Sequence, residues 1–217
     1  MNLPLMSHFD YKSSYHRNLP HIQPPGATLF VTFRLAGSLP QCVIGQWQKE
    51  QRWLRHLAKT NPFHHERVEA EFERKWFAKF EEILDGASIG PVWLSDERIA
   101  DIVVGSLRHR DGEVYRLDAF SIMTNHVHAV IKPHPLPGEE DLEQSLSTIM
   151  QSLKGYTSFN CNQLLGREGE FWAHESYDHW IRDDDEWHRI VAYVLNNPLK
   201  AGYVKRWQDW KWNYRRV

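Results

Sequence analysis

Residues 114–132 read VYRLDAFSIMTNHVHAVIK, and this stretch decides the fold. Two runs rich in strand-forming residues, Val114–Met123 and His126–Lys132, flank the short turn Thr124-Asn125. Such a pattern predicts an antiparallel hairpin. The fold therefore has a hairpin near the middle of the chain, and the remaining elements are placed around it.

The second strand of this hairpin carries His126 and His128. Alternate side chains of a strand point to the same face, so the two imidazoles stand side by side on a rigid element. Two neighbouring imidazoles suit a divalent metal ion. With 13 histidines in the chain, a chance pair at this spacing is the alternative.

Before the hairpin, the sequence predicts one strand and three helices. In Ala27–Leu35 every second residue is apolar, and the residues between them are partly polar, as in a half-buried strand. Ile44–Ala58 and Phe63–Leu84 have helical periodicity, and Asn61-Pro62 separates them. A capped helix begins at Ser95. The paired helices predict a helical-hairpin insertion over residues 46–86, to which we assign no function.

After the hairpin, a helix is expected from about Glu140 to Leu165, with Leu142 and Tyr156 on its apolar stripe. Tyr177–Arg182 is a short predicted strand. The run Asp183-Asp184-Asp185 starts a last helix that ends at Asn197-Pro198. This order predicts an α/β (α+β) fold, a ferredoxin-like sandwich with a central antiparallel sheet. We expect residues 1–217 to form a single domain.

The net charge, the cysteine spacing and the lack of long apolar runs narrow the class of protein. The net charge is -2, which argues against a uniformly basic nucleic-acid binder, but residues 200–217 form a basic, Trp-rich tail. Such a tail supplies phosphate contacts and stacking, or is a solvated terminus anchored by its tryptophans. Cys42 and Cys161 match no metal or redox spacing, Met1–Asp10 is no leader, and no long apolar run is present. We expect a soluble, cytoplasmic protein without membrane contact.

The last helix offers a tyrosine outside its buried stripe. At about 100° per residue, Tyr193 projects roughly 130° from the centre of that stripe, and Asn197 lies one turn further on the same side. A surface tyrosine followed by an end-of-helix asparagine is the plain alternative. Tyr156 is a rival, but its position on an apolar stripe predicts packing. Tyr177 is a weaker rival, in a strand beside Asp178 and His179.

Taken together, these motifs resemble the HUH single-tyrosine transposases, and more closely the REP-associated tyrosine transposases. The segments that carry the likeness are HIQPPGATLFVTFRLAGSLP (21–40), MTNHVHAVI (123–131), YDHWIR (177–182) and YVLNNPLKAG (193–202). The resemblance runs from about His16 to Trp212. The histidine pair alone is a weak signal, but the pair followed by Tyr-x-x-x-Asn-Pro is specific.

The resemblance implies a mechanism and a set of site residues. His126 and His128 would bind a divalent cation, Mg²⁺ or Mn²⁺, and Asn197 would be the third polar ligand. Tyr193, on a catalytic C-terminal helix, would attack a DNA phosphate and form a 5′-phosphotyrosine link with a free 3′-OH. A phenol with a pKa of about 10 needs such assistance at neutral pH.

The implied substrate is single-stranded or hairpin DNA of REP-like sequence. The candidate DNA contacts are basic, aromatic or imidazole side chains of the strand before the last helix and of the tail: His179, Arg182, Lys205, Arg206, Trp210 and Lys211. His179 is equally well explained as a structural residue. The chain would act as a monomer or as a homodimer, with the tyrosine supplied in cis or in trans.

Two other functions stay open from the sequence. One is a non-catalytic DNA-binding protein that regulates from the same fold. The other is a small metallohydrolase that uses water as the nucleophile, although no strong third ligand lies near His126 and His128 in the sequence.

Overall fold

The computed structural model describes residues 14–16, 20–22, 24, 26–60, 62–87, 89–136 and 138–217. Met1–Asp10, in which no leader is expected, and Asn61 lie outside these residues, as does the side chain of Leu142. No helix of the described part has the length and apolar character needed to cross a bilayer.

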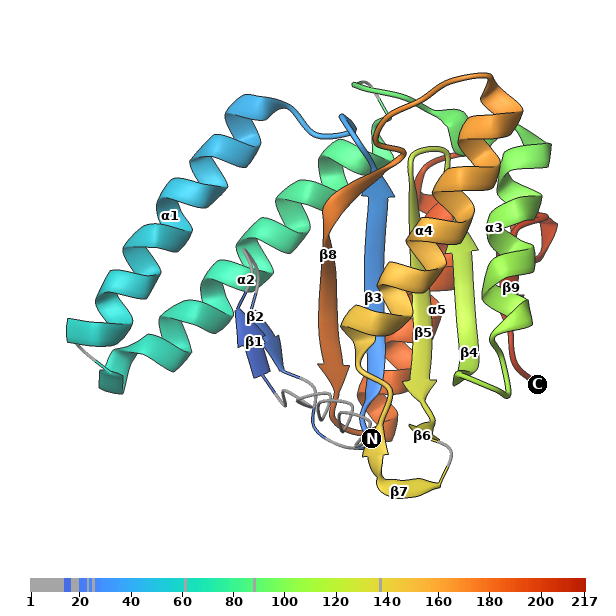
Figure 1. Cartoon of the computed structure of the whole chain (residues 1–217). Coiled ribbons are helices and arrows are strands. Elements are labelled where there is room, and N and C mark those ends of the chain that lie inside the picture. Colours follow the sequence, from blue (N-terminus) through green and yellow to red (C-terminus); the bar gives the residue numbers. More distant parts are fainter. Residues whose placement is uncertain are drawn as a thin grey trace, which may run out of the picture.

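The centre of the fold is a five-stranded sheet in the order β8-β3-β5-β4-β9, with every neighbouring pair antiparallel (Figure 1). Its strands are β3 (Thr28–Leu35), β4 (Tyr115–Ile122), β5 (His126–Pro133), β8 (Trp172–Ile181) and β9 (Asn213–Arg215). The first four occupy the positions 4-1-3-2 that define the ferredoxin-like sandwich. The predicted fold class and the predicted hairpin are therefore confirmed.

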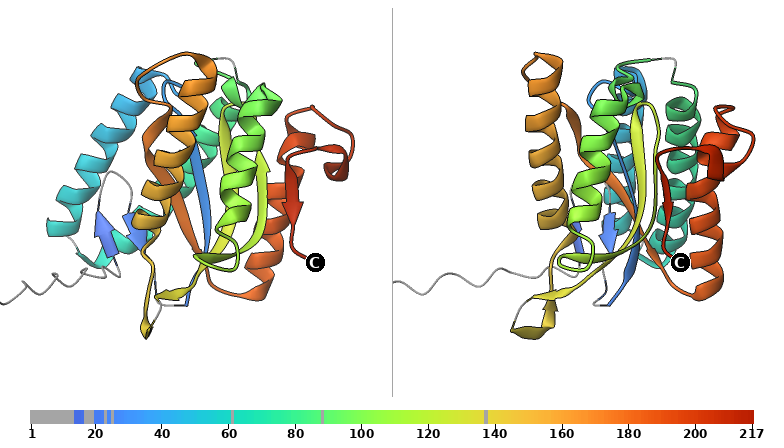
Figure 2. Two further views of the ribbon diagram at one scale, coloured as in Figure 1. Left: turned by 45° about the vertical axis from the view of Figure 1, so that its right-hand side comes forward. Right: turned by 90° about the vertical axis from the view of Figure 1, so that its right-hand side faces the viewer.

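Helices cover both faces of this sheet (Figure 2). One face carries α3 (Glu97–His109) and α4 (Leu146–Leu165), and the other carries α5 (Asp184–Lys200). Phe30 and Thr32 are buried on the α5 side. We expected β3 to be half-buried, and this is wrong, because α5 and the end of α2 cover its second face.

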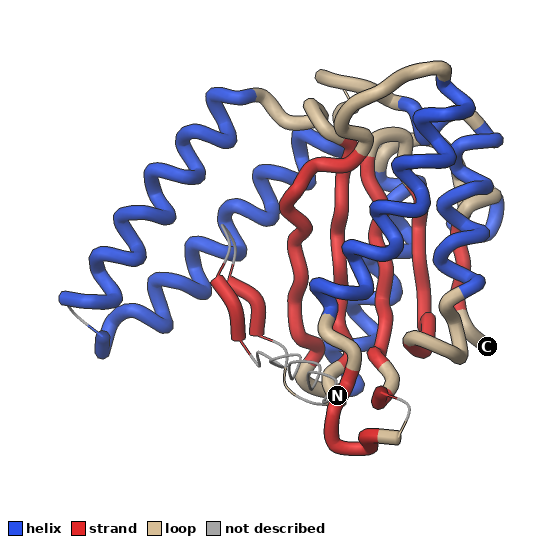
Figure 3. Tube along the Cα trace, in the orientation of Figure 1, coloured by secondary structure: helices blue, strands red, loops and turns tan. Residues whose placement is uncertain are grey.

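The insertion is an α-hairpin made of α1 (Gln41–Thr60) and α2 (Pro62–Asp85), which extends beyond the β8 edge of the sheet (Figure 3). Its helices hold a small core of their own, built from Trp47, Leu54, Phe72 and Trp76. The end of α2 returns to the sheet, where Leu84 is buried. This return brings the insertion next to the histidines of β5.

Several predicted helix boundaries differ from the structure. Both helices of the insertion begin earlier and end later than the predicted Ile44–Ala58 and Phe63–Leu84. Helix α3 is capped by Asp96, whose side chain accepts from the Arg98 N–H, because Ser95 belongs to a short 3₁₀ turn (Trp93–Ser95). Helix α4 begins at Leu146 after the cap Ser145, since Glu139–Glu143 pairs as β7 with β6 (Pro135–Leu136). Helix α5 continues to Lys200. Proline in a last turn removes one backbone donor without ending the helix.

The minor elements are β1 (Ser14–His16), which pairs with β2 (Pro20–Ile22), and a 3₁₀ turn over Trp207–Asp209. Strand β8 begins five residues before the predicted strand at Tyr177. The side chain of Tyr156 is 54% exposed, so it does not pack in the core. It lines a groove between α4 and α3, with Arg110 5.9 Å from its ring, so of the two expected kinds of packing, core or groove, the structure has the second.

The C-terminal tail packs onto the domain. Strand β9 pairs with β4 and so covers that edge of the sheet. Trp212 is buried and its indole N–H donates to Asp101, while Trp210 donates to the carbonyl of Ile122 and stacks on Tyr203. The tail is thus anchored by its tryptophans.

Candidate functional site

The two histidines of β5 lie on the sheet face that α5 covers, and both are buried. Their Nε2 atoms are 3.0 Å apart. Each ring uses its other nitrogen for a hydrogen bond, so the two Nε2 atoms converge on one point. The prediction that the imidazoles stand side by side is met by this geometry.

A chain of hydrogen bonds fixes the tautomer of His126. The carbonyl of Leu84 can only accept, so the group of Asn125 that meets it at 3.0 Å is the amide Nδ2. The carbonyl Oδ1 of Asn125 therefore faces His126 Nδ1 at 2.6 Å, and that nitrogen carries the proton. Nε2 of His126 is therefore unprotonated, and its lone pair can accept a hydrogen bond from His128 Nε2, which lies 3.0 Å away.

His128 has a more adaptable partner. Its Nδ1 lies 2.8 Å from the hydroxyl of Thr32, its cross-strand neighbour on β3. A hydroxyl can donate or accept, so either tautomer of His128 is satisfied at Nδ1. His128 Nε2 can therefore carry a proton towards Glu81 or present a lone pair to a cation.

The third member of the site is Glu81 of α2, which the sequence analysis missed. Its Oε2 lies 3.2 Å from His128 Nε2, and one oxygen of this carboxylate and the two imidazole nitrogens lie within 4.8 Å of one another. The other oxygen, Oε1, is buried and makes no hydrogen bond within the described residues. The sequence does contain a signal, since Glu81 shares a helix face with the apolar residues Phe77 and Leu84.

Tyr193 joins the same cluster. Its hydroxyl donates a hydrogen bond to Oε2 of Glu81, and its ring centroid is 5.6 Å from that of His128. The ring also packs edge-on against Phe30 and near Phe77. We expected Tyr193 on a helix face that the core does not use. The structure corrects this, because α2 covers that face.

Asn197 and Asp85 lie at the border of the cluster. Asn197 is 1% exposed, and neither atom of its carboxamide has a partner at hydrogen-bond geometry within the described chain. Asp85 Oδ1 is 4.0 Å from His126 Nε2, and Oδ2 pairs with Lys200 at 2.7 Å. The pair holds the end of α2 against the end of α5.

Burial dominates the electrostatics of the cluster. It lowers the pKa of His126 to about 3, helped by the neighbouring His128, so His126 is neutral at pH 7. Burial opposes the ionisation of Glu81, but the two imidazoles and the Tyr193 hydroxyl outweigh it and lower the pKa of Glu81 to about 2. Burial, followed by the charge of Glu81, raises the pKa of Tyr193, while Asn197 acts in the opposite direction.

This donor set fits a divalent cation. It offers a neutral imidazole with an unprotonated Nε2, a second imidazole that can present a lone pair, and an ionised carboxylate with a spare oxygen. The ring nitrogens that face away from the centre are held by Asn125 and Thr32, the arrangement that orients metal-binding histidines. The unpartnered carboxamide of Asn197 is a further candidate ligand at the border.

Two predicted DNA contacts, His179 of β8 and Arg182 just after that strand, lie beside the first turn of α5. His179 Nε2 is 2.9 Å from Glu186, which also accepts from the backbone N–H of Arg182. The exposed side chain of Arg182 lines a cavity with Arg116 and Lys132. His179 thus has a structural partner, and Arg182 remains available to a ligand.

The predicted contacts of the tail differ in their surroundings. Arg206 pairs with Asp209 at 3.0 Å, and Lys211 pairs with Glu97 at 3.0 Å. Lys205 is exposed, whereas Trp210 is partly buried by its stack on Tyr203. None of these side chains lies in the cluster around His126 and His128.

Comparison with known proteins gives three findings. Residues 95–197 match the model of the family described as "Transposase IS200 like". A putative REP-associated tyrosine transposase of Haemophilus influenzae is 29% identical over 101 residues, which cover 44% of this chain and 56% of that protein. The chain thus spans little more than half the length of this relative.

This chain also aligns with a solved structure described as the REP-associated tyrosine transposase bound to a REP hairpin. The alignment covers 93% of this chain and 82% of that one, with 19% identity and a TM-score of 0.47. The family match and the curated relative confirm the resemblance drawn from the sequence.

Proposed function

From the match of residues 95–197 to the IS200-like transposases, we propose that this chain cleaves single-stranded DNA beside a REP-like hairpin and transfers the cut strand through Tyr193. One observation carries the proposal. The same oxygen of Glu81 accepts a hydrogen bond from the Tyr193 hydroxyl and lies 3.2 Å from His128 Nε2. The candidate nucleophile and the candidate cation ligands therefore share one carboxylate oxygen.

The proposed step is a phosphoryl transfer without a change of oxidation state. The Tyr193 oxygen forms a bond to phosphorus, and the bond from phosphorus to the 3′ oxygen breaks. The phenol loses its proton, and the leaving 3′ oxygen gains one. Glu81 accepts the hydrogen bond of the phenol and so orients its oxygen, and the phenol proton passes to water, because a carboxylate with a pKa of about 2 is too weak a base to hold it. The 5′-phosphotyrosine keeps the bond energy, so a free 3′-OH can later rejoin the strand.

We propose that His126, His128 and Glu81 hold a divalent cation, with Asn197 as the further ligand. When bound, the cation would offset negative charge at the phosphate and lower the pKa of a neighbouring phenol. Two imidazoles favour Mn²⁺ or another transition ion, and Mg²⁺ is acceptable if water and phosphate supply the remaining oxygens. The close approach of the Tyr193 and His128 rings within one chain favours action of the tyrosine in cis.

The remaining proposals concern the whole chain. Residues 1–217 would act as one domain in the cytoplasm, with 200–217 as the basic tail and with a helical insertion whose helices span 41–85, where 46–86 was predicted. DNA would be contacted by Arg182 and Lys205, whose side chains are exposed. The monomer and the homodimer both stay open.

The test is covalent capture. A fluorescent oligonucleotide that carries a hairpin and a single-stranded flank is incubated with the protein and Mn²⁺, and denaturing gels separate the protein–DNA adduct. We expect the wild type to form the adduct and Tyr193→Phe to form none while it still binds the DNA. Tyr156→Phe, which changes an exposed tyrosine of α4, is the matched control and keeps the adduct. An adduct with Tyr193→Phe refutes the assigned nucleophile.

A non-catalytic DNA-binding protein is the second candidate, and the partial burial of Tyr193 beneath α2 favours it. In that case the wild type binds the hairpin tightly and forms no adduct with any divalent cation. The same gels and an anisotropy titration distinguish the two functions.

A further inference from the structure

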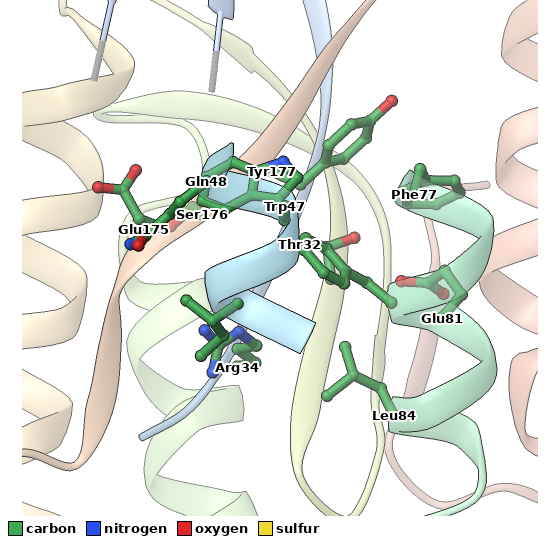
Figure 4. Close-up of a pocket in the computed structure, with 12 residues that line it drawn as sticks. Thr32, Arg34, Trp47, Gln48, Phe77, Glu81, Leu84, Glu175, Ser176 and Tyr177 are labelled. Atoms are coloured by element: carbon green, nitrogen blue, oxygen red, sulfur yellow. The ribbon is translucent and has the colours of Figure 1, made fainter. Parts of the chain in front are cut away.

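Within the described residues, the candidate centre is closed to a DNA strand. Its candidate ligands are at most 3% exposed: His126, His128, Glu81 and Asn197. The cavity beside the centre, between the helical hairpin and the sheet, holds about 90 Å³ (Figure 4). Sites for small molecules span about 300–1,000 Å³, so this cavity is too small for a nucleotide. Part of the chain must move before a phosphate can reach Tyr193.

The helical hairpin covers the centre and holds together by itself. Four buried apolar side chains form its internal core: Trp47, Leu54, Phe72 and Trp76. Glu50 of α1 accepts from Lys75 and from the indole N–H of Trp76 on α2, which ties the two helices to each other. The hairpin can therefore move as one body while its own core stays packed.

Both connections of the hairpin to the domain contain a glycine, and these two glycines touch. Gly37 precedes α1 and Gly90 follows α2, and each has a φ of 80°, which other residues rarely adopt. A Cβ atom at Gly90 would overlap the carbonyl of Gly37 and lie 2.9 Å from the Cα of Ser38. The two connections thus cross at one point. A few residues at the ends of elements can absorb the rotation of a hinge, and these positions suit that role.

Polar contacts at the end of α2 join the hairpin to the domain. Glu81 accepts from the Tyr193 hydroxyl in the centre. One turn later, Asp85 pairs with Lys200 of α5 at 2.7 Å. The side chain of Asp85 is 10% exposed and that of Lys200 is 57% exposed, so this pair lies at the rim of the centre. It can break while the core of the domain stays packed.

We propose that the helical hairpin is a lid over the candidate centre, hinged at Gly37 and Gly90 and latched by the Asp85–Lys200 pair. Opening carries Glu81 away with α2, which releases the Tyr193 hydroxyl and uncovers the face of the sheet that holds the histidines. Closing returns the carboxylate to the centre. The use of the lid to admit DNA rests on the proposed function, whereas the opening itself does not.

The first test measures opening without DNA. In a Cys42→Ser background, Thr32→Cys places a thiol beneath the hairpin, at a position that is 6% exposed. Native Cys161, buried in the main core, reports global unfolding. Mass spectrometry follows the modification of both thiols by a maleimide in the folded protein. We expect the Thr32→Cys thiol to react at least roughly tenfold faster than Cys161, because local opening costs less free energy than global unfolding.

Variants of the latch and of the hairpin separate the lid from general loosening. Lys200→Ala should speed the reaction of the Thr32→Cys thiol roughly fivefold and leave Cys161 slow. Lys75→Ala is the matched control, because Lys75 pairs with Glu50 inside the hairpin at 2.9 Å, and it should change neither rate. A Thr32→Cys thiol that reacts no faster than Cys161 overturns the proposal. Equal effects of Lys200→Ala and Lys75→Ala overturn the latch.

A second readout needs no substitution under the hairpin. Spin labels on Arg52→Cys of α1 and Gln163→Cys of α4, both exposed positions, report the distance between the hairpin and the domain in the Cys42→Ser background. We expect a second distance to appear when Lys200→Ala and Tyr193→Phe remove two contacts of α2. A single, unchanged distance contradicts the proposal.

Neither readout requires DNA or cleavage. Opening without a Tyr193 adduct in the capture assay would refute the proposed function alone, and an adduct from a protein whose hairpin stays closed would refute this inference alone.

Discussion

Substitution of Asn125 by alanine should weaken both the fold and the candidate metal site. Its amide donates to the carbonyl of Leu84 at 3.0 Å, and its Oδ1 accepts from His126 Nδ1 at 2.6 Å, all in a buried region. Asn125→Ala leaves one carbonyl and one ring N–H without partners. An unsatisfied buried group costs about 1–3 kcal/mol, so the free energy of unfolding should fall by about 2–6 kcal/mol.

The same substitution removes the group that fixes the His126 tautomer. Loss of such a partner lowers metal affinity by about 10–100-fold. Urea unfolding followed by tryptophan fluorescence measures the stability, and calorimetric titration with Mn²⁺ measures the affinity. Asn196→Ala is the control, because the exposed Asn196 amide bonds only to the carbonyl of Ala192 in its own helix. It should change neither quantity by more than about 0.5 kcal/mol.

Asn125→Asp separates the two effects. It keeps an acceptor for His126 Nδ1 but loses the donor to Leu84, so we expect lower stability with Mn²⁺ affinity close to the wild type. A folded Asn125→Ala protein that binds Mn²⁺ as tightly as the wild type would refute the role assigned to the tautomer.

Three further predictions follow from single contacts. Thr32→Val should lower Mn²⁺ affinity about tenfold in a calorimetric titration while Thr32→Ser restores it, because only a hydroxyl can serve the ring nitrogen that it contacts; equal affinities would contradict this. Asp96→Ala should lower the free energy of unfolding, measured in urea, by about 1 kcal/mol and by more than Ser95→Ala does, because Asp96 caps α3. A larger loss for Ser95→Ala would mean that Ser95 is the cap, as the sequence predicts. A thiol reagent at pH 8 should modify Cys42 and leave Cys161 intact until the protein unfolds, because burial raises the pKa of Cys161 to about 12; rapid modification of both native thiols would disprove it.

The features that depend on the residue pattern within a single strand or helix could be predicted from the sequence. The hairpin around Asn125 was predictable from two β-rich runs and a short turn, and the histidine pair followed from the period of the strand. Tyr193 and Asn197 were found from the period of a helix. In each case the residues that matter are neighbours in one element, so no tertiary contact was needed to relate them.

Glu81 could not be assigned in this way. Its partners His128 and Tyr193 are 47 and 112 residues away, and only the return of α2 to the sheet brings them together. Residues 46–86 contain eight basic and eight acidic residues, which is typical of an amphipathic hairpin with a solvated outer face. A carboxylate in line with Phe77 and Leu84 was the one local sign that this part of α2 is buried for a reason other than packing.

The role of the tail tryptophans could not be decided from the sequence for a different reason. A basic segment with several tryptophans is compatible with base stacking and with simple anchoring, and the sequence leaves both open. Trp210 and Trp212 each donate an indole N–H to an acceptor on the sheet or on α3, which accounts for their positions. Which acceptors these indole N–H groups reach depends on where the edge of β4 lies. That position is known only once the sheet is assembled.

The return of α2 has a consequence for comparing or engineering related chains. An insertion of variable sequence is normally treated as exchangeable, since it lies outside the elements that define the fold. Here the exchange of residues 41–85 would remove the Glu81 carboxylate from the candidate centre. Transfer of this hairpin between relatives would therefore change the donor set of that centre, and a chimaera would need its own acidic residue at the position of Glu81.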